Sequence, residues 1–311
     1  MGQFESKNLR IAITGGAGFI GAALANELRF RGYGEIKLLD NLSTGDWSRL
    51  NCEDSRFLID ISTAKVDDLP QALSGTDILF HLSAVKLHNE KNSFEDLIRN
   101  NVIGTQNLLV AAGLAEVKKI VFTSSLYAYG MLKDRIFTEN SLPLPSTVYG
   151  SSKLMGEGLV SIAAQKYGFK YSIARLFFIY GENQYSTGGY KSVIVKNFER
   201  LKSGQSAVIN GDGEQILDYL HVSDCVSALI SLSENVTNDV FNISSGIPLS
   251  IKQLTRQMLK VTGEDSLMYA DADWTHGTRR VGSNRKIQKL TGWFPSTTLD
   301  EGLTRTWESL N

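Results

Sequence analysis

The chain has 311 residues, of which 42% are hydrophobic, so it is long enough to bury a sizeable core. Its formal net charge is -1 with both signs mixed along the sequence, which excludes the basic face of a nucleic-acid-binding protein and the polybasic strip of a membrane-surface protein. No apolar run approaches the length of a membrane span, and the polar start MGQFESKNLR differs from a signal peptide, so we expect a cytoplasmic protein. Cys52 and Cys225 lie far apart without a CxxC pair, so we expect reduced cysteines and no metal site.

Apolar segments that alternate with helical patterns predict the fold class. Strands are expected at residues 10–14, 36–40, 56–60, 77–81, 119–123 and 170–176, and helical patterns cover residues 19–31 and 94–115. This order predicts a parallel sheet with helices on both faces, that is, an α/β fold of the Rossmann-type, doubly wound kind.

The first predicted strand ends in ITGGAGFIG, which places Gly15, Gly18 and Gly21 three residues apart across a strand-to-helix turn. Glycines at this spacing permit a tight turn and a close approach of the backbone to a pyrophosphate, whose charge then lies at the positive end of the helix. An ordinary β-to-α turn explains the motif equally well. The turn therefore predicts a dinucleotide site only in combination with other residues.

Asp40 strengthens the prediction of a dinucleotide site. It ends the second predicted strand, about twenty residues after the glycine turn, where a carboxylate accepts both adenosine ribose hydroxyls and repels a 2'-phosphate. This favours NAD over NADP. The alternative is that Asp40 only forms the turn DNLSTG. Asp60, which ends the third predicted strand, is a candidate contact for the adenine amino group.

Two further segments supply candidate catalytic groups. FTSSLYAYG, which includes Ser125, has three consecutive hydroxyl side chains and no acid, and VYGSSK places Tyr149 and Lys153 four residues apart on one face of a helix. A neighbouring ammonium and a cationic nicotinamide both favour the phenolate, so Tyr149 is predicted to act as a base near neutral pH. YxxxK also occurs by chance, but its combination with the glycine turn and Asp40 argues against chance.

Beyond residue 177 the pattern changes to loops rich in Gly, Asn, Ser and Tyr, such as YGENQYSTGGY, with shorter elements between them. This change predicts a smaller C-terminal α/β domain that shapes a substrate pocket. We expect an NAD-binding domain at 1–176, to which 212–245 returns, and a substrate-binding domain at 177–211 and 246–311.

The chain resembles the extended short-chain dehydrogenases/reductases of the NAD-dependent epimerase/dehydratase family, the group that includes UDP-galactose 4-epimerase. The resemblance covers nearly the whole length. The segments that carry it are TGGAGFIG, LLDNLSTG, HLSA, NNVIGT, FTSSLYAYG, YGSSK, GDGEQILDYLHVSD and LTGWFP.

The resemblance implies roles for the candidate residues. Tyr149 would be the base, Lys153 would hold the nicotinamide ribose and tune Tyr149, and Ser125 would bind the reacting oxygen. His81 would be a structural residue at a strand end. The expected cofactor-binding residues are Gly15, Gly18, Phe19, Ile20, Gly21, Asp40, Asn41, Ser43, Thr44, Gly45, Asp60, Ile61, Leu82, Ser83, Ala84, Lys86, Asn101, Tyr149 and Lys153.

The residues after Ser125 limit the reaction. The family's 4,6-dehydratases have Asp and Glu there for the elimination of water, whereas this chain has Leu126 and Tyr127. Hydride chemistry remains, so we predict an isomerase of carbohydrate metabolism that epimerises a nucleotide sugar, at C4, through a transient 4-keto sugar. The alternatives are an NAD(P)-dependent sugar-nucleotide reductase or dehydrogenase, a dehydratase, and a non-catalytic NAD-binding regulator.

The substrate pocket departs from the family pattern. Phe178, Leu217 and Asp273 stand where relatives have Asn, Arg and Arg facing the nucleotide-sugar diphosphate. The residues expected to bind substrate are Ser125, Phe178, Lys191, Arg279 and Arg280, although the three cations could equally be solvated surface charges.

A homodimer is also expected. In relatives the helix that begins at Tyr149 and the one at 94–115 pair across a two-fold axis. Small residues on the first of these helices, at Gly156, Gly158, Ala163 and Ala164, would allow the close approach.

Overall fold

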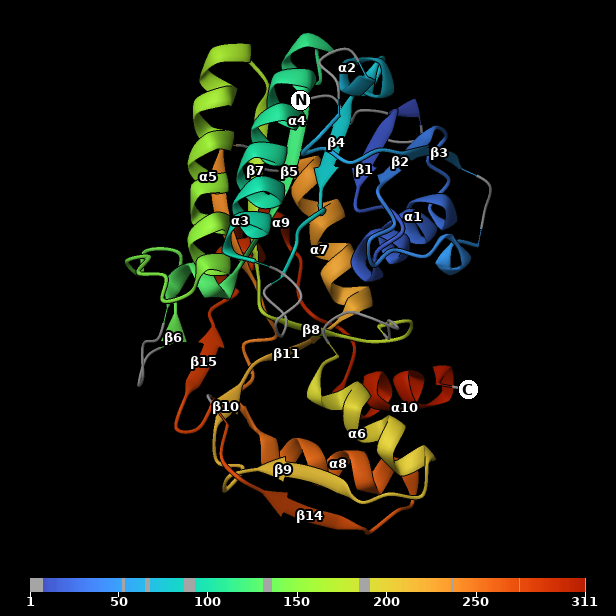
Figure 1. Cartoon of the computed structure of the whole chain (residues 1–311), viewed down its shortest axis with the longest axis vertical. Coiled ribbons are helices and arrows are strands. Elements are labelled where there is room, and N and C mark those ends of the chain that lie inside the picture. The colour runs from blue at the N-terminus through green and yellow to red at the C-terminus, as the bar shows by residue number, and fades with distance from the viewer. Residues whose placement is uncertain are drawn as a thin grey trace. The chain divides into compact units, whose positions relative to one another are not determined.

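The computed structural model describes residues 8–51, 54–64, 68–86, 93–130, 136–184, 191–235, 238–273 and 275–310. The chain divides into two compact units (Figure 1). The first contains Met1–Gly130, Pro143–Arg175 and Leu229–Phe241, and the second contains Met131–Leu142, Leu176–Ala228 and Asn242–Asn311.

These ranges differ from the expected domain ranges in two places. Residues 131–142 belong to the second unit because the short strand β6 (Ile136–Phe137) pairs with β15 (Arg279–Gly282). Most of the expected returning segment also belongs to the second unit, where β11 (Tyr219–His221) pairs with β8 (Phe178–Tyr180). Only Leu229–Phe241 of that segment lies in the first unit.

A seven-stranded parallel sheet forms the centre of the first unit, in the order β12-β7-β5-β4-β1-β2-β3 (Figure 1). Its order reverses between β1 and β4, and ligands bind at the carboxyl ends of the strands at such a point. The strands are β1 (Ile11–Thr14), β2 (Ile36–Asp40), β3 (Ser55–Leu58), β4 (Ile78–His81), β5 (Lys119–Ser125), β7 (Lys170–Leu176) and β12 (Asp239–Ile243).

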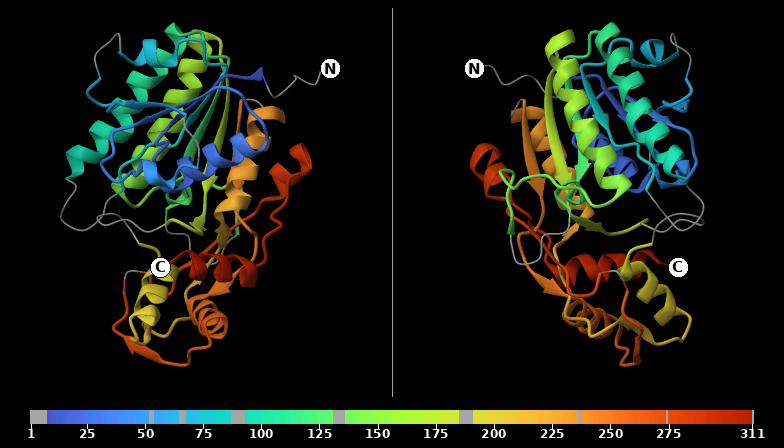
Figure 2. Two further views of the ribbon diagram at one scale, coloured as in Figure 1. Left: turned by 90° about the vertical axis from the view of Figure 1, so that its right-hand side faces the viewer. Right: turned by 60° about the vertical axis from the view of Figure 1, so that its left-hand side comes forward.

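Helices cover both faces of this sheet, which confirms the predicted doubly wound α/β fold. The helix pair α4 and α5 lies on one face, while α1 and the end of α7 lie on the other (Figure 2). The apolar residues of α4 and α5 bury Leu108 and Val160 against Phe122 of the sheet. The helical elements are α1 (Phe19–Phe30), η2 (Trp47–Arg49), α2 (Asp68–Leu73), α3 (Phe94–Ile98), η3 (Arg99–Ile103), α4 (Gly104–Leu114), η4 (Leu126–Tyr129), α5 (Val148–Tyr167) and α7 (Val222–Asn235).

The single helix expected at 94–115 is interrupted by a π-helical turn, η3. This turn contains Asn101, whose amide exchanges two hydrogen bonds of 2.8 Å with the backbone of Val85 and donates a third, of 3.0 Å, to Ser152 of α5. These bonds hold the Asn101 side chain between Val85 and Ser152. Regular helix lies on both sides of the π-turn, as α3 before it and α4 after it. Such π-turns occur often at functional sites.

The second unit contains smaller sheets in the orders β13-β10-β15-β6, β11-β8 and β14-β9. Helices α6, α8 and α10 contribute Phe198, Leu254 and Leu303 to its apolar core. Its other elements are α6 (Val193–Lys202), β9 (Ala207–Asn210), β10 (Ile216–Leu217), β13 (Leu249–Ser250), α8 (Ile251–Thr262), β14 (Leu267–Ala270), α9 (Arg285–Thr291) and α10 (Leu299–Ser309).

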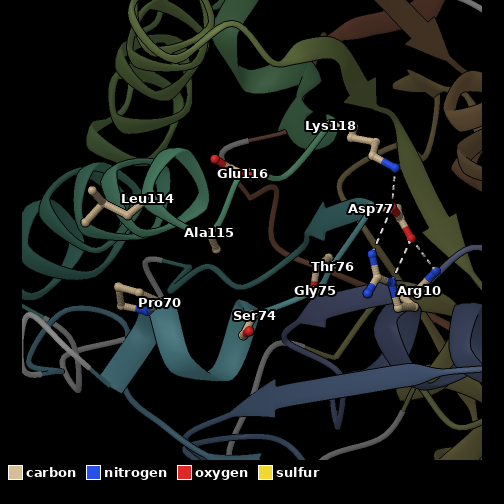
Figure 3. A pocket seen from close by; sticks show the side chains of 10 residues that line it. All are labelled: Arg10, Pro70, Ser74, Gly75, Thr76, Asp77, Leu114, Ala115, Glu116 and Lys118. Carbon is tan, nitrogen blue, oxygen red and sulfur yellow. Dashed lines mark hydrogen bonds and ion pairs between the residues drawn. The ribbon is translucent and has the colours of Figure 1, made fainter.

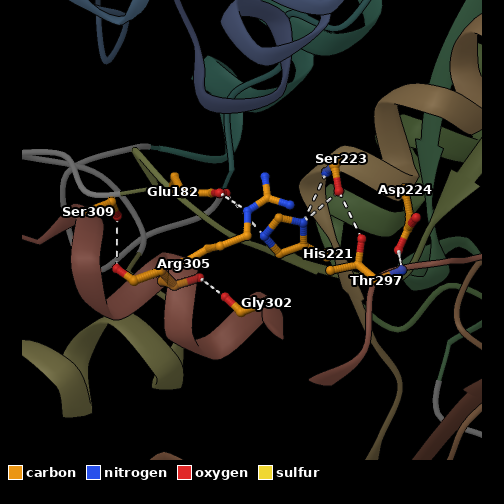
Figure 4. A network of polar contacts seen from close by, with 9 residues as sticks. Glu182, His221, Ser223, Asp224, Thr297, Gly302, Arg305 and Ser309 are labelled. Atoms are coloured by element: carbon orange, nitrogen blue, oxygen red, sulfur yellow. Dashed lines mark hydrogen bonds and ion pairs between the residues drawn. The ribbon is translucent and has the colours of Figure 1, made fainter. Parts of the chain in front are cut away.

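A buried histidine joins several elements of the second unit (Figure 4). His221, at the end of β11, lies 2.8 Å from the Ser223 hydroxyl through Nδ1 and 3.1 Å from Glu182 through Nε2. Arg305 of α10 donates to the same carboxylate at 2.6 Å. Burial opposes ionisation of Glu182, but the hydrogen bond from His221 prevails and lowers the pKa of Glu182 to about 2. We assign this network a structural role.

In the described part of the chain, no helix combines the length and the apolar character needed to cross a membrane. Within the same residues, no group of three His, Cys, Asp or Glu side chains is arranged to hold a metal ion. Cys225 is a buried free thiol, and Cys52 lies outside the described residues.

Candidate active site

The glycine turn after β1 has the geometry that a bound dinucleotide requires. Gly15 adopts a φ of +71°, and a Cβ there would lie 2.8 Å from the backbone nitrogen of Ser83. A Cβ on Gly21 would overlap the carbonyl oxygen of Gly15. Gly18 precedes α1, and no side chain caps the first turn of this helix. The backbone is thus open to a pyrophosphate at the positive end of α1, so the residues present fit NAD.

Asp40 lies at the carboxyl end of β2, beside this turn. Its carboxylate accepts hydrogen bonds from the backbone N–H groups of Ala17 at 3.0 Å and Leu42 at 2.8 Å. Burial raises the pKa of Asp40, and these two bonds oppose the rise. A Cβ on Gly45 would lie 2.7 Å from the Asp40 carboxylate, so Gly45 leaves room for the acid. The carboxylate is therefore held in a fixed position, with lone pairs left for ribose hydroxyls.

Asp60 lies beyond the end of β3. Its carboxylate accepts hydrogen bonds from Asn41 at 3.0 Å and from the Ser62 hydroxyl at 2.6 Å. Burial opposes ionisation, yet these hydrogen bonds prevail and lower the pKa of Asp60. The expected contacts Asn41, Ser43 and Thr44 are exposed, while Ile61 is buried.

The end of β4 is fixed by a chain of hydroxyl groups and an imidazole. His81 lies 2.7 Å from Thr14 through Nδ1 and 2.9 Å from Thr105 through Nε2. Since the Thr105 hydroxyl donates its proton to the Asn101 carbonyl, we assign the His81 proton to Nε2. Burial lowers the pKa of His81 to about 3, so the ring is neutral. These contacts favour the structural role that the resemblance implied for His81, and Ser83 donates to the same Thr14 hydroxyl.

The three candidate catalytic residues lie in the first unit. Ser125 ends β5, and Tyr149 and Lys153 lie on the first turns of α5, which begins after the side-chain cap Thr147. The ammonium of Lys153 donates to the Thr123 carbonyl at 2.8 Å and lies 5.0 Å from the centre of the Phe122 ring. Thr123 was not predicted from the sequence, because a backbone acceptor leaves no motif.

The electrostatics of this site differ from the expectation for Tyr149. Burial raises the pKa of Tyr149 above that of a free tyrosine, and the hydrogen bond with Ser125 opposes the rise. Burial and the charge of Lys86 lower the pKa of Lys153 to about 7, against the effect of Glu157. Burial of the phenol therefore favours the protonated form of Tyr149 at neutral pH, and Lys153 is itself close to losing its proton.

The side chains of the two residues after Ser125 pack against neighbouring residues. Leu126 is buried, and the Tyr127 ring contacts the Tyr149 ring edge-on with centroids 5.9 Å apart. Neither position carries an acid that could move a proton during elimination of water.

The other predicted substrate residues belong to the second unit. The Phe178 ring lies 5.7 Å from that of Tyr219, and Leu217 is buried in β10. Lys191 forms an ion pair of 2.7 Å with Glu199. Arg279 and Arg280 are adjacent on β15, where Arg280 is buried and Arg279 is partly exposed; Asp273 accepts a hydrogen bond from Asn210.

Comparisons with known proteins place the site in a family context. Residues 11–244 match the NAD dependent epimerase/dehydratase family. A UDP-glucose 4-epimerase of Mycolicibacterium smegmatis is 28% identical, with 96% of this chain and 98% of the relative covered. Two solved structures are similar. One is the UDP-glucose 4-epimerase of Thermotoga maritima with UDP-glucose, with a TM-score of 0.89, 30% identity and coverage of 97% and 98%. The other is the dTDP-glucose 4,6-dehydratase DesIV of Streptomyces venezuelae with NAD bound, with a TM-score of 0.87, 26% identity and coverage of 97% and 96%.

Proposed function

Because the chain belongs to the NAD-dependent epimerase/dehydratase family and uses NAD, we propose that it is a nucleotide-sugar epimerase that inverts C4. Bound NAD supplies a hydride acceptor that later returns the hydride. Tyr149 takes the proton of the 4-hydroxyl as the C4 hydride leaves, and Ser125 donates a hydrogen bond to the resulting ketone oxygen. Rotation of the ketone would present its other face to the cofactor, and Tyr149 would then return the proton to the oxygen.

This proposal depends mainly on one observation. The chain has Ser125, Tyr149 and Lys153, and the two residues that follow Ser125 are not acidic. Leu126 and Tyr127 provide no acid for the elimination of water, which favours an epimerase over a dehydratase. A reductase with the same three residues is the second candidate, since it needs the same hydride chemistry.

The test is incubation of the NAD-containing protein with UDP-glucose, UDP-N-acetylglucosamine, UDP-glucuronic acid and dTDP-glucose, followed by NMR of the products. We expect a C4 epimer and no net change in cofactor oxidation state. A 4-keto-6-deoxy product would contradict the proposal in favour of a dehydratase, and net cofactor turnover would favour a reductase. Retention of cofactor through gel filtration separates the epimerase from the reductase, which must exchange it.

Asp40 is proposed to select NAD over NADP. Its buried carboxylate is fixed by hydrogen bonds from the backbone N–H groups of Ala17 and Leu42. In this position the carboxylate would accept hydrogen bonds from the ribose hydroxyls of NAD and would repel the 2'-phosphate of NADP. Calorimetric titration of cofactor-stripped protein is expected to show tighter binding of NAD. Asp40→Asn should reduce the preference, whereas Asp46→Asn, a matched change in an exposed cap of the same loop, should keep it. Equal or tighter NADP binding by the unchanged protein would refute this role.

The cations of the second unit are proposed to bind the substrate diphosphate. Of these, Arg279 is the one to test, because Arg280 is buried and Lys191 is paired with Glu199. Arg279→Glu is expected to raise KM for the active nucleotide sugar by roughly tenfold or more, since a charge-assisted bond contributes about 1.5 to 3 kcal/mol. NAD affinity and kcat should change little. An unchanged KM would exclude this residue from the pocket.

The homodimer is also a proposal, and its sequence argument needs a correction. Gly156 faces the sheet, where a Cβ would lie 2.6 Å from the Phe122 ring, and Ala163 and Ala164 belong to the apolar core. Of the four small residues, only Gly158 has open space around it. These residues therefore fit α5 to its own sheet and do not explain an interface.

Exposed apolar side chains give a better argument for the dimer. Ile103, Val110 and Leu114 lie seven and four residues apart along one side of η3 and α4, and Met155 and Ile162 lie seven apart on α5. The helices α4 and α5 pack side by side (Figure 2), and we infer that the two rows together form one apolar surface. Light scattering at micromolar concentration should report a dimer. Ile162→Glu should give monomers, whereas Phe30→Glu, a matched change at a more exposed position on α1, should not. A monomeric unchanged protein would refute the proposal.

A further inference from the structure

A buried ion pair lies beneath the candidate catalytic residues. Arg175 of β7 donates to Glu157 of α5 through Nε at 2.8 Å and through Nη2 at 2.6 Å, and both side chains are less than a tenth exposed. Burying two charges has a large desolvation penalty, and apolar replacements are often no less stable. Stability alone is therefore a weak reason for this pair.

The pair holds the strand that carries Ser125. The hydroxyl of Ser124, the preceding residue, donates to the carboxylate of Glu157. One turn earlier on α5, Lys153 donates to the carbonyl of Thr123. Helix α5 thus binds two successive residues of β5 immediately before Ser125.

The same pair also supports the chain after Ser125. The guanidinium of Arg175 lies over the ring of Tyr129, with its central carbon 4.5 Å from the ring centre. Tyr129 ends η4, the short helix that follows Ser125, and is fully buried. The Glu157–Arg175 pair therefore contacts the chain on both sides of Ser125, through Ser124 before it and Tyr129 after it.

Glu157 also affects the charge of the site. The titratable groups that act on Lys153 or are acted on by it are Lys86 and His81 from the segment at the end of β4, and Glu157 from its own helix. His81 is neutral, and burial lowers the pKa of Lys86. Glu157 thus supplies the negative charge that favours the ammonium form of Lys153.

We propose that the Glu157–Arg175 pair is the positioning element of this site: it fixes the end of β5 against α5, and its carboxylate, one helical turn from Lys153 on α5, favours the ammonium form of that residue. The inference rests on the proposed function only in assigning the chemistry to Ser125, Tyr149 and Lys153. Glu157 and Arg175 act through these residues.

Two variants separate position from charge. Ser124→Ala removes one hydrogen bond and keeps every charge, so kcat should fall by roughly tenfold while Lys153 titrates as before. The double variant Glu157→Gln, Arg175→Met removes both charges with little change of volume, which allows the protein to fold. In it kcat should fall on the order of tenfold to hundredfold, and Lys153 should lose its proton at lower pH.

Two measurements are made on the NAD-containing protein. The first is the pH profile of kcat with UDP-glucose, whose high-pH limb should move to lower pH in the double variant. The second is an NMR titration of protein with 13C-labelled lysine side chains, in which Lys153→Met identifies the Lys153 signal. The second needs no turnover, so it tests the inference even if UDP-glucose is not a substrate.

A second carboxylate–guanidinium pair, at the opposite end of the sheet and with a half-exposed arginine, provides the control. Arg10 donates to Asp77 through Nε at 3.1 Å and Nη2 at 3.4 Å, and Lys118 pairs with the same carboxylate (Figure 3). Asp77→Asn, Arg10→Met should leave the kcat profile and the Lys153 titration unchanged. The inference is overturned if the Glu157 double variant titrates like the unchanged protein, or if Ser124→Ala has full kcat in a protein that epimerises UDP-glucose.

Discussion

Tyr149→Phe is expected to lower kcat by on the order of 10³-fold while NAD remains bound. The change removes the proposed base and keeps the aromatic ring, so the edge contact with Tyr127, at 5.9 Å between centroids, is retained. Turnover of the active nucleotide sugar and the NAD content of the purified variant are the two measurements. Near wild-type turnover would end the proposed mechanism.

The structure adds a condition to this prediction. Since burial raises the pKa of Tyr149, its own surroundings favour the phenol at neutral pH. The positive nicotinamide ring of bound NAD must supply the remaining bias toward the phenolate. Tyrosinate absorbance of the NAD-containing protein should therefore begin at lower pH than that of the stripped protein, and Tyr149→Phe should abolish the difference. Tyr171→Phe, which removes a hydroxyl that bonds Ser161, is the matched control.

Local sequence patterns were sufficient for the parts of the fold that depend on local interactions. The strands at 36–40 and 170–176 have the predicted bounds, because their apolar residues form short runs between clear turn signals. The turn after β1 was recognisable because Gly15 and Gly21 occupy places where a Cβ would clash. The start of α5 could be inferred because Tyr149 and Lys153 are one helical turn apart.

Features that depend on distant contacts were not predictable in this way. The π-turn at Arg99–Ile103 contains Asn101, which is bonded to two segments remote in sequence. The Glu157–Arg175 pair joins a helix to a strand, and neither residue belongs to a local motif. The inward orientation of Gly156 was missed because a glycine carries no sign of which helix face is buried.

Lys153→Met is expected to have the second large effect on activity. Loss of the ammonium removes the bond to the Thr123 carbonyl and the proposed contact with the nicotinamide ribose, so both kcat and NAD affinity should fall, kcat by on the order of 10²-fold or more. Turnover and calorimetric NAD titration measure the two effects. Lys166→Met, at an exposed position on the same helix, is the matched control and should change neither. Full NAD affinity in Lys153→Met would remove the ribose contact from the mechanism.

The same variant should be more stable than the unchanged protein when both are stripped of NAD. The pKa of Lys153 in the folded chain is lowered from 10.5 to about 7, chiefly by burial, so the unfolded chain binds this proton more tightly. The loss of folding stability that results from burying the Lys153 ammonium is therefore largest below pH 7. It falls as pH rises and vanishes above about pH 10.5. Lys153→Met removes this loss, and its melting temperature should exceed that of the unchanged protein at pH 7 by more than at pH 9. A difference that stays constant between these two pH values would show that Lys153 is not buried as an ammonium, and its proposed tuning of Tyr149 would then lose its physical basis.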